Sequence, residues 1–336
     1  MSKDNAGQPA HPFDKHMLDL DAATETQRIV DSLRRNVHEV LHRQGAIVGI
    51  SGGVDSSVVL ALCARTFGPE RVVGVLLPEG ESSPDSARLA HLLADQFTVP
   101  TVTEDISEAL RGAGCYRRRD EAIARVFPDY ANDWKAKIVL PGQLLEKDTL
   151  NVFYLTVTSP NGQEFTKRLP LREYYQIVAA SNFKQRTRMA MLYYHAELRN
   201  YAVVGTANKN EHDQGFFVKH GDGGVDVAPI VHLFKTQVYQ LAQYLGIPEE
   251  IQSRTPTSDT YSAGSTQEEF FFRVPFAILD VIWFGYEHNF PAASIAQALD
   301  LTTVQVERVI ADIVRKQRTT AYLRAGALGT ERAPAR

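Results

Sequence analysis

The sequence has few cysteines, no membrane-length apolar run and no excess of basic residues. Only Cys63 and Cys115 occur in 336 residues, which fits neither a disulfide framework nor a zinc site. Cys63 lies in an apolar stretch and is interpreted as a small buried residue. No run reaches the roughly 18 apolar residues that span a membrane. The formal net charge of −4 excludes a global basic field that holds nucleic acid non-specifically.

The N-terminal residues 1–12 are polar and lack the apolar region of a signal peptide. We therefore expect a soluble cytoplasmic protein. With 44% hydrophobic residues, the chain is able to bury a substantial core. The predicted organisation is a flexible leader over 1–23, a main domain over 24–290 with a β-hairpin insertion at about 149–170, a helical C-terminal extension over 291–325, and a flexible tail over 326–336.

The most informative stretch is a strand, a glycine turn and a helix in direct succession. Residues 46–50 form a short β-branched run typical of a buried parallel strand, and residues 51–53 are Ser-Gly-Gly. The apolar run 58–63 then continues as a helix. Free N–H groups and the positive end of the helix dipole meet at such a turn, which predicts a phosphate site. Asp55 repels a polyphosphate unless a cation bridges them, so it is a candidate Mg²⁺ ligand.

Strands and helices alternate along most of the chain. This order predicts an α/β fold with a doubly wound, mostly parallel sheet and ligands at the carboxyl ends of its strands. Further strands are predicted at 72–77, 101–106 and 201–206, a polar loop at 207–226, and helices at 24–44, 84–97, 182–198, 235–245, 266–288, 294–299 and 303–322.

Two regions depart from this alternation. Residues 151–158 and 163–169 flank Ser-Pro-Asn-Gly, a hairpin signal. That hairpin either covers a substrate or dimer partner or is a plain surface hairpin. The last two helices resemble a helix-turn-helix pair. Their basic residues favour a solvated face over a DNA reader: Arg308, Arg315, Lys316 and Arg318.

Four further blocks carry polar groups. Glu211 follows a predicted strand and is either a second Mg²⁺ ligand or a surface glutamate. The Gly-rich block 215–226 is typical of a binding loop, although such a loop is weak evidence alone. Lys235 begins a helix, where the dipole disfavours a cation, so it either meets an anionic ligand or is solvated. Residues 256–259 either bind a ligand or cap a helix.

These blocks together resemble the NAD⁺ synthases, within the N-type ATP pyrophosphatases. The Ser-Gly-Gly-x-Asp-Ser loop is shared across that superfamily, whereas Gly-Thr-x-x-x-x-Glu followed by Lys-x-Gly-Asp-Gly-Gly-x-Asp is more particular to the family. The resemblance covers roughly residues 29–287 and includes the block 182–189. It implies an adenine nucleotide alpha hydrolase-like, Rossmann-like fold. It also implies an enzyme that amidates deamido-NAD⁺ with ammonia through an adenylated intermediate, giving NAD⁺, AMP and pyrophosphate.

The resemblance also implies roles for individual residues. ATP is expected to bind Gly49, Ile50, Ser51, Gly52, Gly53, Val54, Asp55, Ser56, Ser57, Thr206, Lys235 and Thr257. Mg²⁺ is expected at Asp55 and Glu211, and the deamido-dinucleotide at Arg186, Phe216, Lys219, Asp222 and Asp226. Asp55, Asp222 and Lys235 are the expected catalytic residues, with Asp222 binding or deprotonating the ammonium ion.

Three departures bear on the acceptor acid. The hairpin is foreign to the compact family pattern, Leu76 stands where some relatives carry an adenine-stacking arginine, and the C-terminal His-Lys pair is absent. We therefore keep two alternatives: the same chemistry on another carboxylate, and an RNA-modifying or RNA-binding protein. The leading hypothesis implies a homodimer with its dinucleotide site across the interface. The chain has no room for a glutaminase domain, so ammonia is expected to be free or to come from a separate glutaminase.

Overall fold

A four-stranded parallel sheet forms the centre of the molecule. The computed structural model describes residues 12–131, 133–140, 142, 144–146, 152–256, 262–264 and 266–329. Ala46 of the central strand lies opposite Val72 on one side and Ala202 on the other. The predicted parallel sheet is confirmed, and its strands end at one common edge. Its order is β3-β2-β1-β7, with β1 Ala46–Gly49, β2 Val72–Leu76, β3 Thr101–Thr103 and β7 Ala202–Val204.

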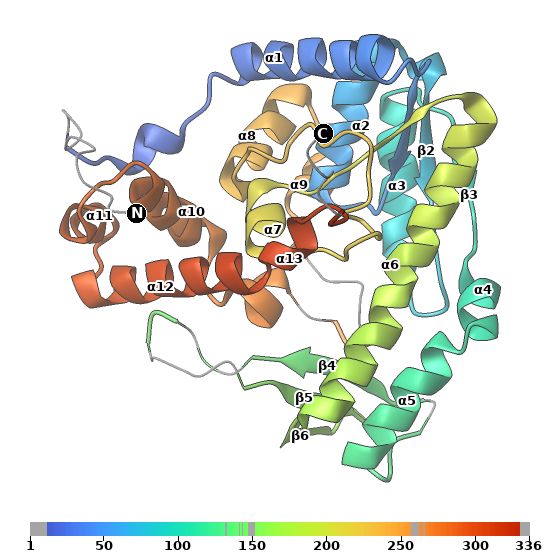
Figure 1. Cartoon of the computed structure of the whole chain (residues 1–336), viewed down its shortest axis with the longest axis vertical. Coiled ribbons are helices and arrows are strands. Elements are labelled where there is room, and N and C mark those ends of the chain that lie inside the picture. The colour runs from blue at the N-terminus through green and yellow to red at the C-terminus, as the bar shows by residue number, and fades with distance from the viewer. Residues whose placement is uncertain are drawn as a thin grey trace, which may run out of the picture.

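Helices cover both faces of this sheet (Figure 1). Val48 points to the face covered by α1, α2, α3, α8 and α9, and Ile47 points to the face covered by α6. This alternation follows from the two-residue period of a strand, and it confirms the doubly wound fold. The bounds are α1 Ala22–Arg34, continued by the π-helical η2 Arg35–Val40, α2 Val54–Phe67, η3 Pro69–Arg71, α3 Pro84–Gln96, α6 Leu171–Arg199, α8 Lys235–Leu245 and α9 Glu249–Gln252.

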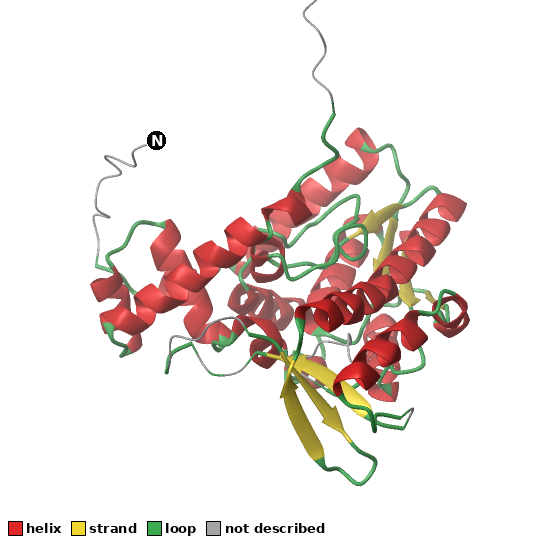
Figure 2. Cartoon of the chain, turned by 60° about the horizontal axis from the view of Figure 1, so that its bottom comes forward, coloured by secondary structure: helices red, strands yellow, loops and turns green. Residues whose placement is uncertain are grey.

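A second, antiparallel sheet lies beside the N-terminal end of α6, away from the central sheet (Figure 1 and Figure 2). The predicted hairpin is confirmed as β5 (Tyr154–Thr158) paired with β6 (Glu164–Arg168). A third strand, β4 (Lys135–Val139), pairs with β5 and was not predicted. Ile138 and Val157 pack on α5 (Cys115–Val126) and α6. Neither α5 nor α4 (Ser107–Gly112) was predicted, because these short helices are mostly polar and bury only a narrow apolar face.

The C-terminal helices share one core with residues outside them. The predicted helix 266–288 is wrong as a single element, because Arg273 has a φ of 64° and Pro275 follows it. Trp283 packs in the same core as Leu18 of the predicted leader, so the predicted boundaries at 23 and 290 both cut through packed structure. The elements are η1 Lys15–Leu18, η4 Glu268–Phe272, α10 Phe276–Glu287, α11 Ala292–Leu299, α12 Thr303–Thr319 and α13 Ala321–Arg324.

One short helix interrupts the predicted loop 207–226. It is α7 (Lys209–Gln214), whose N-cap Asn208 forms a capping box with Glu211. The loop prediction is wrong there. The segment is polar and has no apolar periodicity, so its helix is stabilised by the cap rather than by an apolar face. Among the described residues, no helix has both the length and the apolar character needed to cross a membrane.

Candidate active site

The predicted phosphate loop is a tight turn between β1 and α2. Gly52 has a φ of 73°, and a Cβ atom there would lie 2.7 Å from the carbonyl oxygen of Ser86, so only glycine fits. The Ser56 and Ser57 hydroxyls donate to the Gly53 carbonyl oxygen at 3.0 and 2.9 Å. These bonds shape the loop and leave the first amides of α2 at its mouth, which is the geometry of an anion site.

A buried lysine and a carboxylate meet beside this loop. Asp55 lies in the first turn of α2, and Lys235 is the first residue of α8. The Lys235 ammonium group forms a hydrogen-bonded ion pair with Oδ2 of Asp55, although the lysine side chain is only 1% exposed. Oδ1 of Asp55 accepts a 2.9 Å bond from the Asn208 side-chain amide. The sheet edge therefore brings together groups from α2, α8 and the start of α7.

Glu211 completes this group, which we name the Lys235 cluster (Asp55, Asn208, Glu211 and Lys235). Asn208 accepts from the Glu211 N–H at 3.0 Å, and Oε2 of Glu211 accepts from the Asn208 N–H at 3.2 Å. Burial, and then the negative charge of Asp55, raise the pKa of Glu211 to about 8, against the opposing charge of Lys235. Two carboxylates thus face one ammonium group, and the cluster is short of positive charge.

This deficit suits a divalent cation. Carboxylate oxygens are the protein ligands that Mg²⁺ prefers, usually one or two per ion, with substrate phosphates and water completing the octahedron. Asp55 and Glu211 supply that number. Within the described ranges, no group of three or more acidic, His or Cys side chains is arranged to hold a metal ion. An ion here therefore depends on phosphate oxygens or water for its remaining ligands.

Two residues of the site were missed from the sequence. Asn208 was readable as the N-cap of a capping box, because Glu211 follows three positions later. Arg254 follows α9 and donates to the Gly52 carbonyl oxygen at 3.3 Å and to the Ser86 hydroxyl at 3.0 Å. It therefore clamps the phosphate loop to the start of α3. No local sequence pattern predicts such a contact, because its partners are distant in sequence.

The residues expected to bind the dinucleotide lie near the C-terminal helices. The Arg186 guanidinium donates to the Lys219 carbonyl oxygen at 3.2 Å. The Lys219 ammonium donates to the carbonyl oxygens of Tyr322 and Ala325 at 3.0 and 2.7 Å. Phe216 packs against the rings of two neighbours at centroid distances of 4.8 and 5.5 Å, namely Phe271 and Phe272. The structure brings Arg186 and Lys219 together, and both contact protein carbonyl groups.

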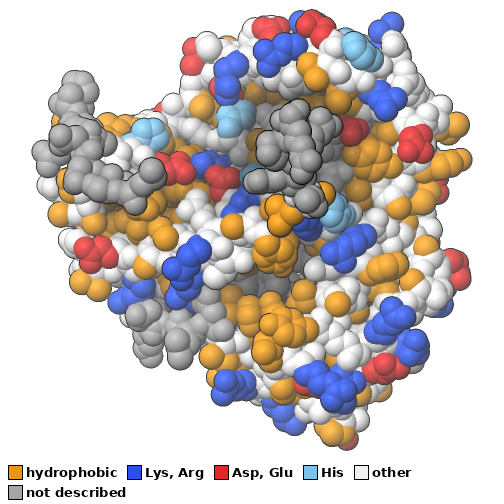
Figure 3. Space-filling model, viewed as in Figure 1, with side chains coloured by type: hydrophobic (Ala, Val, Ile, Leu, Met, Phe, Trp, Pro, Cys, Tyr) orange, Lys and Arg blue, Asp and Glu red, His pale blue; other side chains and the backbone are white. Residues whose placement is uncertain are grey.

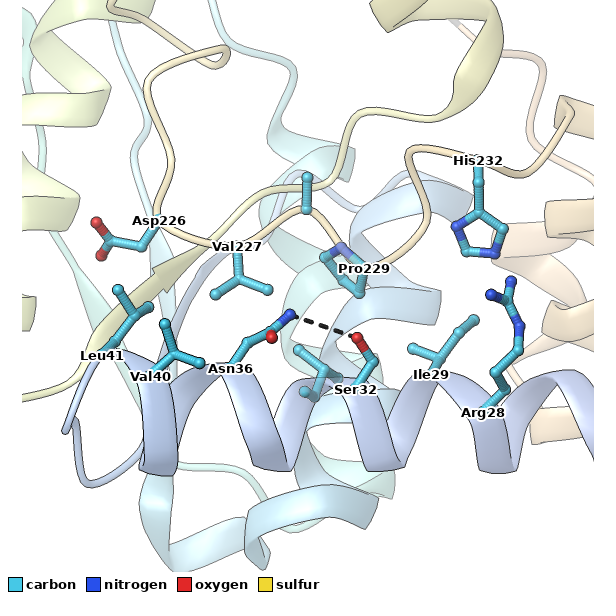
Figure 4. A pocket seen from close by; sticks show the side chains of 12 residues that line it. Arg28, Ile29, Ser32, Asn36, Val40, Leu41, Asp226, Val227, Pro229 and His232 are labelled. Carbon is cyan, nitrogen blue, oxygen red and sulfur yellow. Dashed lines mark hydrogen bonds between the residues drawn. The ribbon is translucent and has the colours of Figure 1, made fainter.

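The two aspartates of the Gly-rich block differ. Asp222 accepts a 2.8 Å bond from the Val218 N–H, and burial raises its pKa to about 6. Asp226 accepts from the Tyr193 hydroxyl at 2.9 Å and from the Val203 N–H at 2.8 Å, so both its oxygens have protein partners. It lines a separate pocket of about 300 Å³ between α1 and residues 226–232 (Figure 4).

Two further ATP contacts were predicted outside the phosphate loop and α8, at Thr206 and Thr257. Thr206 comes two residues after the end of β7, at the carboxyl edge of the sheet. Thr257 lies outside the described residues.

The comparison with family models decides the classification. Residues 25–125 and 149–321 match the model of the NAD synthase family, which is most of the chain. The chain belongs to the NAD synthase family. The two matched segments leave out residues 126–148, which contain β4.

Similar proteins agree with this membership. The chain is 50% identical over 309 residues to an NH₃-dependent NAD⁺ synthetase of Mesorhizobium japonicum, covering 92% of this chain and 97% of that protein. It is 47% identical to the protein of the same name from Rhizobium meliloti, covering 94% and 93%.

Two solved structures share the fold of this NAD synthase family member. An NH₃-dependent NAD synthetase from Campylobacter jejuni has a TM-score of 0.58 at 21% identity and covers 93% of this chain and 100% of its own. An NMN synthetase from Francisella tularensis has a TM-score of 0.57 at 22% identity and covers 93% and 99%.

Proposed function

We propose that this protein joins ammonia to the nicotinate carboxylate of deamido-NAD⁺, with ATP cleaved to AMP and pyrophosphate. Similarity to NH₃-dependent NAD⁺ synthetases over nearly the full chain supports this substrate. The observation that carries the chemistry is the Lys235 cluster at the mouth of the phosphate loop. A buried ammonium group and two carboxylates beside free helix amides fit the triphosphate of ATP and its counter-ion.

The first step requires positioning and charge neutralisation more than a protein nucleophile. The acceptor carboxylate attacks the α-phosphorus, an acyl adenylate forms, and pyrophosphate leaves. The α2 amides at the loop bind the departing pyrophosphate oxygens, and the Lys235 ammonium lies where negative charge develops. Arg254 keeps the loop in its binding conformation through Gly52.

We further propose that the ATP is bound with Mg²⁺, held by Asp55 and Glu211. The ion would supply charge neutralisation on the phosphate oxygens. The raised pKa of Glu211 supports this role, because a carboxylate destabilised by a like charge gains most from a nearby cation. Before ligand binds, Lys235 partly fulfils that role by its ion pair with Asp55.

The second step needs neutral ammonia. We assign Asp222 as the group that accepts a proton from the ammonium ion, after which ammonia attacks the acyl adenylate and AMP leaves. A carboxyl group whose pKa is raised to about 6 is a better proton acceptor near neutral pH than an ordinary aspartate. A shielded site then limits hydrolysis of the adenylate.

A homodimer is part of the proposal. Several large apolar side chains are exposed on the solvent-facing half of α6, spread along its length: Leu171, Tyr175, Phe183, Tyr194 and Leu198. Hydrophobic side chains are visible along the line of α6 (Figure 3). Several exposed apolar residues on one long helix are typical of a surface covered by another subunit. Arg186, on the same helix, would then lie close to that interface.

Sedimentation velocity tests the dimer. Tyr175→Glu and Leu198→Glu place charges on the exposed half of α6 and are expected to shift the protein to monomers. Val304→Glu on α12 is the matched control, since Val304 is equally exposed elsewhere. A wild-type protein that sediments as a monomer at micromolar concentration contradicts the dimer proposal.

The function is tested with purified protein, ATP, Mg²⁺, ammonium and deamido-NAD⁺, following NAD⁺ and pyrophosphate together. We expect both products in equal amounts. Replacing ammonium by glutamine should give no NAD⁺ unless a separate glutaminase is added. Nicotinate mononucleotide is the competing acceptor, because a protein of the same fold is an NMN synthetase. Pyrophosphate release with that acid alone would reject the proposed substrate.

Two free, buried cysteines suit a reducing compartment, so we propose a cytoplasmic location.

A further inference from the structure

A buried carboxylate lies against the first turn of α8, the helix that begins at Lys235. Asp280 belongs to α10 and is 0% exposed. Its Oδ2 accepts hydrogen bonds from both the N–H and the hydroxyl of Thr236, each at 2.9 Å. Its Oδ1 accepts from the side-chain amide of Asn210 at 2.6 Å. The mechanism above gives this buried acid no chemical task.

Asn210 links that carboxylate to two elements of the site. Its amide oxygen accepts a 2.9 Å bond from the backbone N–H of Lys235, and it is itself fully buried within α7. Asn210 immediately precedes Glu211 in the chain. One side chain thus ties the helix that carries Glu211 to the first residue of α8.

The pair caps α8. The first backbone N–H groups of a helix have no acceptor within it. In α8, Asn210 accepts from the N–H of Lys235, and Asp280 accepts from the N–H of Thr236. A negative charge at this end of the helix dipole is favourable. The capping groups come from α7 and α10 instead of the preceding residue, so capping joins three helices. The position of the Lys235 backbone therefore depends on residues that never reach the phosphate loop.

We infer that Asp280 is a positioning residue, which acts through Asn210 and the start of α8 to hold the Lys235 ammonium against Asp55. This inference rests on the proposed function of Lys235. Lysine has a long flexible side chain, and the site of its charge is fixed only if its backbone is fixed. A displacement of about 1 Å at a reacting centre lowers a rate by up to about 100-fold.

The alternative is that Asp280 only stabilises the fold. Both roles predict that Asp280→Asn lowers the melting temperature. They differ in the turnover of the molecules that remain folded. A positioning role lowers kcat of the folded protein at low temperature, whereas a purely structural role leaves kcat at the wild-type value.

The hydrogen-bond pattern allows a swap experiment. In Asp280→Asn, an amide at 280 faces the amide of Asn210, so two donors meet. In Asn210→Asp, a carboxylate at 210 faces that of Asp280, so two acceptors meet. The double variant Asp280→Asn/Asn210→Asp restores the pattern: the amide at 280 donates to the carboxylate at 210 and accepts from Thr236. The carboxylate at 210 accepts from the Lys235 N–H.

We expect each single variant to lose kcat by about 10- to 100-fold, with a smaller change in KM for ATP. The kcat of the double variant should be at least tenfold higher than that of either single variant. Asp312→Asn is the control, since Asp312 is a buried carboxylate whose two oxygens pair with Arg315 and Lys316 of its own helix, α12. It should lower the melting temperature with kcat unchanged. Single variants with wild-type kcat, or a double variant no better than they are, would overturn the inference.

A failure of the proposed function gives a different pattern. If the wild-type protein makes no NAD⁺, the function is rejected, and the positioning role is then read from calorimetric binding of an ATP analogue with Mg²⁺. The single variants should bind it more weakly and the double variant should recover. Equal binding by all variants would reject the positioning role by itself.

Discussion

Two lysines of this protein are equally buried and differ in how their partners are balanced. Lys235 pairs with Asp55 at the phosphate loop, and Lys184 pairs with Glu79 at 3.0 Å and Glu81 at 2.6 Å beyond β2. Each lysine side chain is only 1% exposed. Both clusters follow the carboxyl ends of the parallel strands, so position in the fold alone does not distinguish them.

The Lys184 cluster (Lys184, Glu79, Glu81, Tyr116 and Arg119) is closed, in the sense that both of its carboxylates are balanced by cations or donors of the protein. Glu79 also accepts a 2.6 Å bond from the Tyr116 hydroxyl, and Glu81 accepts a 2.6 Å bond from Arg119. Burial alone would raise the pKa of Glu81, but hydrogen bonds and charges from Arg119 and Lys184 outweigh it, so the pKa is lowered. This cluster ties the segment after β2 to α5 and α6.

The Lys235 cluster is left open. Among the described residues, no lysine or arginine forms an ion pair with Glu211, and burial together with Asp55 raises its pKa to about 8. Opposite directions of the pKa shift thus separate two clusters of similar composition. A buried carboxylate that its protein partners satisfy supports the fold, whereas one left in excess marks the place of a positively charged ligand.

The largest expected effect is from Asp55→Asn, which removes the charge but keeps the shape. Turnover should fall by about 100- to 1,000-fold, the range for losing one electrostatic contact to a reacting group. Pyrophosphate release with deamido-NAD⁺ and ATP measures it, and circular dichroism serves as the folding control. Near-normal turnover would mean that the Lys235 cluster is structural, like the Lys184 cluster.

Glu211→Gln should lower turnover by about 10- to 100-fold without lowering the melting temperature. A glutamine at position 211 keeps the capping box, because its oxygen still accepts from the Asn208 N–H. Its amide group then faces Gln267, which now donates to Oε1 of Glu211. The Gln267 side-chain amide is free to rotate and accept instead, because its oxygen has no partner in the described structure. Glu81→Gln is the contrasting variant. It should destabilise the protein, because the buried cations Lys184 and Arg119 lose the negative charge of Glu81. A similar loss of stability in both variants would remove the distinction between the clusters.

Lys184→Met tests the closed cluster. It leaves the buried Glu79 carboxylate without its cation, which is expected to cost about 3–5 kcal/mol of the free energy of unfolding. Denaturant titration measures the loss. Because Lys184 supports the fold, kcat of the folded fraction should stay within about twofold of wild type. A large fall in kcat at full folding would place Lys184 in the reaction.

The smallest effect is the pH dependence from Asp222. Its pKa is raised by burial to about 6 from an ordinary value of 3.8, so its protonated form is favoured in the folded state. Its contribution to stability is full below 3.8 and is lost as the pH rises to about 6. Activity should instead rise through that window as the carboxylate becomes able to accept a proton. Asp222→Asn should lower kcat/KM for ammonium and remove this rise, and an unchanged profile would exclude Asp222 as the base.

Much of the site follows from the sequence because its parts are local. The turn at Gly52 comes from three consecutive residues, and the helix that begins at Lys235 was expected from its periodicity. The hairpin β5–β6 has a turn signal of its own. The roles of Lys219 and Asp226 came from family resemblance, and in the structure their side chains contact protein groups, so these roles stay predictions.

The sequence by itself determined the parallel sheet, the glycine turn and the hairpin, since short-range periodicity and turn chemistry specify them. Only the tertiary structure decided which charged groups meet. Asp55 and Lys235 are 180 residues apart and Asp280 and Asn210 are 70 apart, and no local pattern encodes such pairs. Whether a buried lysine forms a closed cluster or an open site depends on the balance of charges brought together from distant segments, and that balance exists only after the helices have packed.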